Sequence, residues 1–220
     1  MTIRGVLFDF SGTLFHLEPD PSWFDGQPLD RTKIIDVLTS PASSGYLPEG
    51  LRDAWERRDL DPDIHRMVYL TALRAAAPGV PDDVLTAIYE RVPAAESWMP
   101  YPDTLEVLRG LHAAGLPVAV ISNIPWDIRE VFRRNGMHEL VAEYLLSYAE
   151  GVMKPDPKIF LAACERIGVA PEDALMIGDS DVADGGATRI GCRFAEVERV
   201  PPAARPGALR SALRAHRVLP

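Results

Sequence analysis

Three short apolar runs, each followed at once by polar residues, constrain the fold of this chain more than any other feature. The runs are Gly5–Phe8, Val118–Ile121 and Ala174–Ile177. Short uninterrupted apolar runs are typical of strands buried on both faces, as in a parallel sheet. The polar residues that follow them are Asp9 to Ser11, Ser122 with Asn123, and Gly178 to Ser180. Because ligands bind beyond the carboxyl ends of parallel strands, these polar clusters indicate a functional site.

Helical patterns alternate with the strands. Two weaker strand patterns cover Tyr144–Ser147 and Arg193–Val197. Apolar residues at helical spacing cover Pro102–Ala114, Trp126–Asn135, Asp156–Gly168 and Pro206–Arg217. Strands that alternate with helices in this way predict an α/β fold, a Rossmann-like core with a mostly parallel sheet.

Residues 16–98 break this alternation. They contain no clear strand pattern but several helical stretches, separated by Pro and Gly. These stretches are Leu29–Leu38, Leu47–Arg57, Asp61–Ala76 and Asp82–Val92. A helical block of this size after the first strand predicts an inserted all-helical cap domain at 16–98, with a core formed by residues 1–15 and 99–220.

The composition excludes several classes of protein. A net charge of −9 argues against a nucleic-acid-binding protein, which needs a basic face to neutralise phosphates. No apolar run approaches the roughly 20 residues that a membrane helix needs, and the N-terminus leads into a strand pattern rather than a secretory signal. We therefore expect a cytoplasmic protein with neither nucleic acid nor membrane as partner, and the sequence predicts no particular oligomeric state. Cys164 and Cys192 show no disulfide or zinc spacing and are predicted to be small buried side chains.

Four segments resemble, in the same order, the motifs of the haloacid dehalogenase-like hydrolase superfamily. They are Leu7–Leu14 (LFDFSGTL), Ile121–Asn123 (ISN), Gly151–Phe160 (GVMKPDPKIF) and Ile177–Ser180 (IGDS). The resemblance extends over essentially the whole chain, and the block at 16–98 is similar to the helical cap that the family inserts after its first motif. It implies a hydrolase that acts on a small phosphorylated molecule.

The resemblance also implies a role for each polar cluster. Asp9 would be the nucleophile that accepts the phosphoryl group as an aspartyl-phosphate, which divides one difficult displacement into two easier steps. Thr13 and Ser122 would donate hydroxyl hydrogen bonds to the phosphoryl oxygens, together with main-chain N–H groups of the first loop and of Asn123. Lys154, one of only three lysines in the chain, would neutralise Asp9 and the phosphate.

The implied cofactor is Mg²⁺, which prefers oxygen ligands. The resemblance assigns it the side chains of Asp9 and Asp179 and the main-chain carbonyl of Ser11. Asp184 is expected as the second acid of the fourth motif, reached through water or a hydrogen bond. Many relatives place this acid one residue earlier, where this chain has Ala183, so the register of the loop is open and Asp181 is a competing candidate.

Ser11 departs from the family pattern. Most phosphatases of the superfamily have a second Asp at this position, which protonates the leaving oxygen and then activates water. A Ser hydroxyl cannot perform this chemistry at neutral pH, and general acid–base catalysis contributes ~10²–10⁴-fold. The substitution therefore threatens proton transfer and leaves the main-chain metal ligand intact. His16 directly follows the first motif and is a candidate replacement, although a solvated linker histidine is the simpler interpretation.

The function that the sequence favours is a magnesium-dependent phosphatase or phosphotransferase on a small phosphorylated metabolite. A 2-haloacid dehalogenase would also use an ester on Asp9, but such enzymes generally lack the acid found here at Asp179. A phosphonatase would need a cap lysine for a Schiff base, and Lys33 is the candidate; Lys33 or Arg31 could also reach an anionic substrate. A phosphate-binding protein with weakened catalysis is the remaining alternative. Lys158 is expected to be simply exposed.

Overall fold

The computed structural model describes residues 2–27, 29–39 and 45–219, and a five-stranded sheet lies at its centre. The strand order is β5-β4-β1-β6-β7, and each neighbouring pair is parallel. The strands are β1 (Gly5–Phe8), β4 (Val118–Ser122), β5 (Glu143–Leu146), β6 (Ala174–Gly178) and β7 (Arg193–Glu196). The prediction of an α/β fold with a mostly parallel sheet is confirmed.

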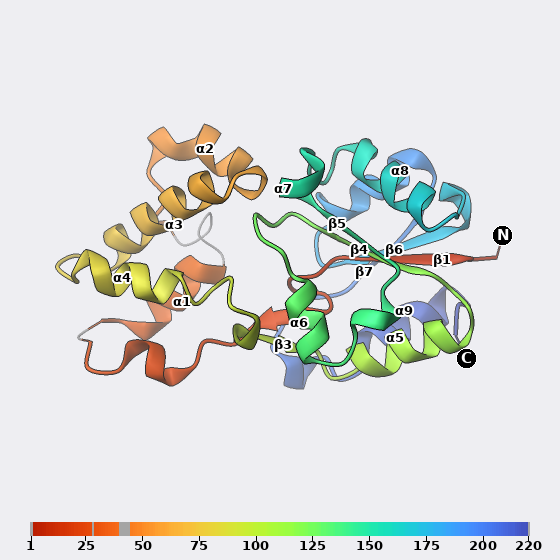
Figure 1. The fold of residues 1–220 in the computed structure, drawn as a ribbon, viewed down its shortest axis with the longest axis horizontal. Coiled ribbons are helices and arrows are strands. Elements are labelled where there is room, and N and C mark those ends of the chain that lie inside the picture. Colours follow the sequence, from red (N-terminus) through yellow and green to blue (C-terminus); the bar gives the residue numbers. More distant parts are fainter. Residues whose placement is uncertain (1, 28, 40–44, 220) are drawn as a thin grey trace.

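Helices cover both faces of this sheet (Figure 1). Because side chains alternate along a strand, β1 points Val6 and Phe8 to one face and Leu7 to the other. The face of Val6 packs against α5 (Thr104–Ala113), α6 (Arg129–Arg134) and α9 (Ala208–Ala215). The opposite face packs against α8 (Pro157–Arg166) and the 3-10 helix Asp184–Ile190. Burial on both faces explains why these strands are continuous apolar runs in the sequence.

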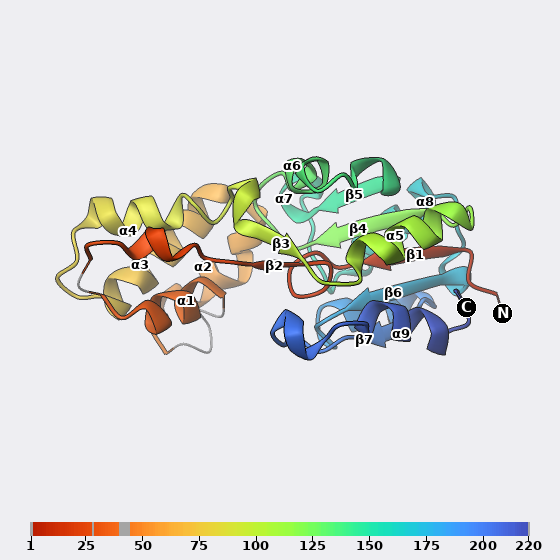
Figure 2. The same ribbon diagram turned by 90° about the horizontal axis from the view of Figure 1, so that it is seen from below.

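In the order of the chain, a helical block lies between strand β1 and the other four strands of the sheet. It contains α1 (Arg31–Thr39), α2 (Arg52–Arg57), α3 (Pro62–Ala76) and α4 (Asp82–Tyr89). The block has its own apolar core, to which Ile34, Leu73, Leu85 and Ile88 contribute. It lies at the end of the molecule opposite both chain termini (Figures 1 and 2). The exact domain boundaries at 15/16 and 98/99 stay a prediction.

Two short strands connect the block to the core, β2 (Phe15–Leu17) and β3 (Trp98–Pro100). They pair antiparallel, with Phe15 opposite Pro100, and run side by side toward the block (Figure 2). The sequence analysis found no strand in residues 16–98 and was wrong on this point. A three-residue strand is too short to show a period of two, so only the pairing of distant segments reveals it.

Other differences from the predicted elements are small. The strand predicted at Tyr144–Ser147 is β5 (Glu143–Leu146), and Ser147 instead begins the short helix α7 (Ser147–Glu150). Further short 3-10 helices cover Pro21–Phe24, Glu49–Leu51, Arg58–Leu60, Ala95–Ser97, His138–Leu140, Pro171–Asp173 and Pro202–Ala204. Cys164 and Cys192 are free and buried, as predicted. Within the described ranges, no helix combines the length and apolar character needed to cross a lipid bilayer.

Candidate active site

The carboxyl ends of β1, β4 and β6 face a cavity of about 260 Å³, which the helical block closes on its other side. All but one of the eight residues that the sequence analysis assigned to the site line this cavity. They are Asp9, Ser11, Ser122, Asn123, Lys154, Asp179 and Asp184. The exception, Thr13, is fully buried behind the loop.

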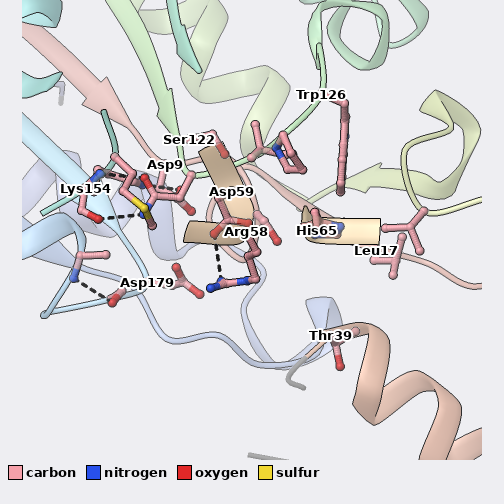
Figure 3. Close-up of a pocket in the computed structure, with 18 of the residues that line it drawn as sticks. Asp9, Leu17, Thr39, Arg58, Asp59, His65, Ser122, Trp126, Lys154 and Asp179 are labelled. Carbon is pink, nitrogen blue, oxygen red and sulfur yellow. Dashed lines mark hydrogen bonds and ion pairs between the residues drawn. The ribbon is translucent and has the colours of Figure 1, made fainter. Parts of the chain in front are cut away.

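Lys154 lies beside Asp9 at one end of the cavity (Figure 3). Its Nζ is 2.6 Å from Asp9 Oδ1 and 2.6 Å from Asp184 Oδ1. The Asn123 amide holds the Lys154 main chain from both sides, with Asn123 Nδ2 donating to the carbonyl and Asn123 Oδ1 accepting from the N–H. Burial opposes the charge on Lys154, but Asp184 and Asp9 outweigh it and raise the pKa of the ammonium. Lys154 is therefore a fixed positive charge beside Asp9.

Three carboxylates converge at this edge of the sheet; those of Asp9 and Asp184 are buried and that of Asp179 is partly buried. Asp9, Asp179 and Asp184 each offer an oxygen within 4.8 Å of the other two. Burial, and then the charge of Asp9, raises the pKa of Asp179 to about 7. Burial likewise raises the pKa of Asp184 to about 6, although Lys154 opposes the shift.

This arrangement fits a hard divalent cation. Asp9 Oδ2 is buried and has no hydrogen-bond partner in the described part of the chain. Three carboxylates against Lys154 and the half-exposed Arg199, which lies 3.7 Å from Asp179, still leave a net negative charge in a largely buried place, which is costly without a further cation. Carboxylate oxygens are the ligands that Mg²⁺ prefers.

Local main-chain geometry explains how the acids reach these positions. Asp184 Oδ2 accepts a hydrogen bond from the N–H of Ser180 at 3.0 Å. Gly178 is necessary at the end of β6, because a Cβ there would overlap the carboxyl group of Asp184. Asp181, the competing candidate for the second acid, is exposed and does not line the cavity.

The loop after β1 also depends on a glycine. Gly12 has a φ of 91°, in the left-handed region, and a Cβ at this position would contact Asp179 Oδ2. The buried Arg205 fixes this loop from behind, donating to the carbonyls of Gly12 at 2.8 Å and Thr13 at 2.6 Å. The sequence analysis missed Arg205, since nothing in its local pattern distinguishes it from the other arginines near the C-terminus.

The helical block contributes a second set of residues that the sequence analysis missed. Arg58 and Asp59 lie between Asp9 and Lys154 on one side and His65 on the other (Figure 3). Arg58, Asp59 and His65 all line the cavity. Asp59 is 4% exposed and pairs with Arg58 at 3.0 Å. Burial raises the pKa of Asp59 to about 6, although Arg58 and Lys154 oppose the shift. No strand end or motif marks these residues, so only the folded block reveals them.

Several weaker candidates do not line the cavity. His16 pairs with Glu18 at 3.3 Å, so its imidazole is engaged outside the site. In the helical block and the segment that leads to it, Arg31 pairs with Asp25 at 3.9 Å and Lys33 with Asp30 at 3.9 Å, and both side chains are about half exposed. The residues that line the cavity include neither Arg31 nor Lys33. The structure thus places Lys33 away from the position that Schiff-base chemistry requires. Lys158 is exposed, as expected.

Known proteins with similar sequences and structures agree with this geometry. Residues 3–189 match the family model described as haloacid dehalogenase-like hydrolase. The chain is 38% identical to the glyceraldehyde 3-phosphate phosphatase of Methanopyrus kandleri, over 90% of this chain and 84% of that protein.

Solved structures give the same result. A HAD phosphatase from Thermococcus onnurineus matches with a TM-score of 0.60 and 25% identity, over 89% of this chain and 86% of that one. A dehalogenase structure with an intermediate complex matches with a TM-score of 0.67 and 21% identity, over 97% of both chains, which shows the shared fold. The chain therefore belongs to the haloacid dehalogenase-like hydrolase family.

Proposed function

We propose that this protein is a magnesium-dependent phosphatase that hydrolyses a small phosphorylated metabolite through an aspartyl-phosphate on Asp9. The observation that carries the proposal is the contact of Asp9 with Lys154 at 2.6 Å, inside a cluster of three carboxylates. A lysine and a cation-binding acid cluster around one carboxylate suit the transfer of a dianionic phosphoryl group, whose charge they neutralise.

Asp9 attacks phosphorus in this mechanism, and the bond between phosphorus and the leaving oxygen breaks. Lys154 contacts Asp9 and faces the phosphoryl oxygens, whose charge it neutralises, while Ser122 lies at the end of β4 to donate to them. Water then cleaves the aspartyl-phosphate, which releases inorganic phosphate and restores Asp9. Asp9, Asp179, Asp184 and the Ser11 carbonyl would hold Mg²⁺, which supplies charge neutralisation when bound.

Ser11 stands in place of the acid–base Asp in this proposal. Its hydroxyl does not protonate the leaving oxygen at neutral pH, so turnover on poor leaving groups is expected to be ~10²–10⁴-fold below that of a site with a general acid. Esters with good leaving groups need little protonation and are affected least. We propose Thr13 as a residue that supports the loop and its phosphate contacts, and residues 16–98 as the cap that closes the site.

The names of two relatives support a small metabolite as substrate, and we propose that the protein acts in the cytoplasm. One is named a glyceraldehyde 3-phosphate phosphatase. Another, from Psychrobacter arcticus, is named a phosphoglycolate phosphatase. Asp179 also favours the proposal over dehalogenation, because displacement of halide by Asp9 needs no metal and has no use for this additional acid.

Phosphate release from a panel of phosphorylated metabolites and acetyl phosphate, with Mg²⁺ and with chelator, tests the proposal. We expect Mg²⁺-dependent release that the Asp9→Asn variant abolishes. The isosteric amide removes the nucleophile and keeps the shape of the site. Background rates over the whole panel, or persistent hydrolysis by Asp9→Asn, would overturn the proposal.

A further inference from the structure

The half of the cavity that the helical block forms has its own polar groups. Figure 3 shows Arg58 and Asp59 facing the cavity between Asp9 and Lys154 on one side and His65 and Trp126 on the other. A phosphate bound at Asp9 would therefore direct the remainder of its molecule toward these side chains. With about 260 Å³, the cavity lies at the small end of ligand pockets, so that remainder is short.

Arg58 is held rigidly in this half. Its guanidinium stacks 3.5 Å from the Trp55 ring centroid, Nη1 donates to the Trp55 carbonyl at 2.8 Å, and Nη2 pairs with Asp59. The remaining nitrogen of the guanidinium, Arg58 Nε, is buried and has no hydrogen-bond partner among the residues that the structure describes.

Trp126 presents a second donor of the same kind. Its indole Nε1 is also buried and, within the described residues, has no acceptor. Both residues line the cavity. A buried N–H without an acceptor costs about 1–3 kcal/mol, so a ligand that brings acceptor oxygens to these two groups is favoured.

The charges of this half cancel. Asp59 neutralises Arg58, and burial lowers the pKa of His65 to about 3, so His65 is neutral. Burial raises the pKa of Tyr69, also in the cavity wall, to about 12, so its phenol is neutral too. Arg199, which lines the cavity in addition to Arg58 and Lys154, faces Asp179 at 3.7 Å, and its side chain is 48% exposed. Two N–H donors and one carboxylate acceptor thus offer hydrogen bonds without net charge.

We infer that Arg58, Asp59 and Trp126 select substrates whose non-phosphorylated end carries uncharged hydroxyl or carbonyl oxygens, and disfavour substrates that end in a carboxylate. Arg58 Nε and Trp126 Nε1 donate to the carbonyl or hydroxyl oxygens, and Asp59 accepts from a hydroxyl. A carboxylate in the same place would meet the buried charge of Asp59, and such repulsion is a common source of specificity. The inference rests on the proposed phosphatase function and names its substrate class.

Two substrates that differ at the non-phosphorylated end test the inference. They are glyceraldehyde 3-phosphate and phosphoglycolate, each assayed with Mg²⁺. The wild type should have the higher kcat/KM for the aldehyde. Asp59→Asn should lower the ratio of kcat/KM for glyceraldehyde 3-phosphate to kcat/KM for phosphoglycolate by about 10- to 100-fold. The reason is that the repulsion by Asp59 is gone and Arg58 can pair with the substrate carboxylate. The matched control is Asp53→Asn, which removes an exposed acid of α2 and should leave the ratio unchanged.

A second variant keeps the test decisive if Asp59→Asn does not fold. Because Arg58 lowers the pKa of Asp59, Arg58→Gln is assayed at pH 9, where the Asp59 carboxylate is charged even without its partner. The ratio should then rise by about tenfold while KM for the aldehyde increases. Arg57→Gln, an exposed neighbour, is its control. Trp126→Phe, which keeps the ring and removes the donor, should raise KM for the aldehyde several-fold with little change in kcat.

The outcomes separate this inference from the proposed function. If the wild type hydrolyses both probes but prefers phosphoglycolate, or if neither Asp59→Asn nor Arg58→Gln changes the ratio, the inference is wrong and the phosphatase proposal stands. If the wild type hydrolyses neither probe nor acetyl phosphate, both are wrong.

Discussion

The hydroxyl of Ser147 donates a hydrogen bond to the main-chain carbonyl of Asp59, and so joins the end of β5 to the helical block. The same hydroxyl accepts a hydrogen bond from the N–H of Ile124 at 2.9 Å. Ser147 is fully buried, so water cannot replace either bond. One side chain therefore connects the loop after β4, the core helix α7 and the segment that carries Arg58 and Asp59.

Ser147→Ala should lower the free energy of unfolding by about 1–3 kcal/mol, because it leaves a buried N–H and a buried carbonyl without partners. It should also raise KM for the substrate, since Asp59 loses its fixed position. Urea unfolding and steady-state kinetics measure the two effects. Ser211→Ala is the control, because the Ser211 hydroxyl bonds the Gly207 carbonyl on the exposed surface of α9. Equal stability of the two variants would contradict the structural role of Ser147.

Lys154→Met should be both inactive and unstable. The change leaves Asp9 and Asp184 as buried charges without a partner, and removal of one member of a buried ion pair typically costs about 3–5 kcal/mol. The loss should shrink at pH 5, because burial raises the pKa of Asp184 to about 6 and the removal of Lys154, which opposes this shift, lets that carboxyl group take up a proton. Thermal unfolding at pH 8 and pH 5 checks this expectation, with the exposed Lys158→Met as control. A loss of stability that is the same at both pH values would show that charge compensation is not the role of Lys154.

Asp179→Asn should stabilise the metal-free protein while abolishing its response to Mg²⁺. The pKa of Asp179 is raised to about 7 in the fold from 3.8. The folded state therefore binds more protons between these values, and stability falls as pH rises through that window. The variant avoids this loss, so its advantage of about 3–4 kcal/mol should be present at pH 8 and disappear near pH 4.

The measurement for Asp179 is thermal unfolding in chelator and in excess Mg²⁺. The wild type should gain stability from Mg²⁺ by mass action, and Asp179→Asn should gain much less. Asp181→Asn, an exposed acid in the same loop, should behave like the wild type. A similar Mg²⁺ response in Asp179→Asn and wild type would remove Asp179 from the proposed metal ligands.

Much of the sheet and its polar edge could be predicted from the sequence because both depend on local patterns. Strands buried on both faces must be continuous apolar runs, and the residues after β1, β4 and β6 necessarily meet at one edge. Asp9, Ser122 and Asp179 are therefore brought together by topology alone.

The remaining parts depend on contacts between segments that are distant in the chain. Arg205 reaches Thr13 across 192 positions, and Ser147 reaches Asp59 across 88. The pairing of β2 with β3 joins segments on either side of the helical block. No local periodicity or motif predicts such contacts. Nor does any local pattern predict that Arg58 and Trp126 line the cavity.

Ser11→Asp tests whether proton transfer limits the wild type. If Ser11 is a lost acid–base group, the new carboxyl should raise kcat on an alkyl phosphate by more than tenfold and change kcat on acetyl phosphate little, because the latter needs no protonation of its leaving group. Asp9→Asn combined with Ser11→Asp should stay inactive, which confirms that the added carboxylate does not act as a nucleophile. An intact Ser11→Asp variant with no gain would mean that another group already transfers the proton.

Acid should destabilise the helical block through His65. The His65 side chain is 3% exposed, stacks on Tyr69 and contacts the Tyr89 hydroxyl at 2.8 Å, and burial lowers its pKa to about 3 from 6.5. Between these values the unfolded state binds more protons, so stability rises with pH and is lost as pH falls below 6.5. At pH 4 the loss from this residue should be about 2–3 kcal/mol.

The comparison of two variants isolates the His65 contribution from those of the buried carboxyl groups, which have the opposite sign. His65→Phe keeps the stacking on Tyr69 and removes the titrating group, so the difference in unfolding free energy between pH 6.5 and pH 4 should change by about 2–3 kcal/mol relative to wild type. Tyr89→Phe removes the hydrogen-bond partner but keeps the buried imidazole, so its pH dependence should follow that of the wild type. If His65→Phe and the wild type lose stability equally between pH 6.5 and pH 4, the buried imidazole is not the acid-sensitive group.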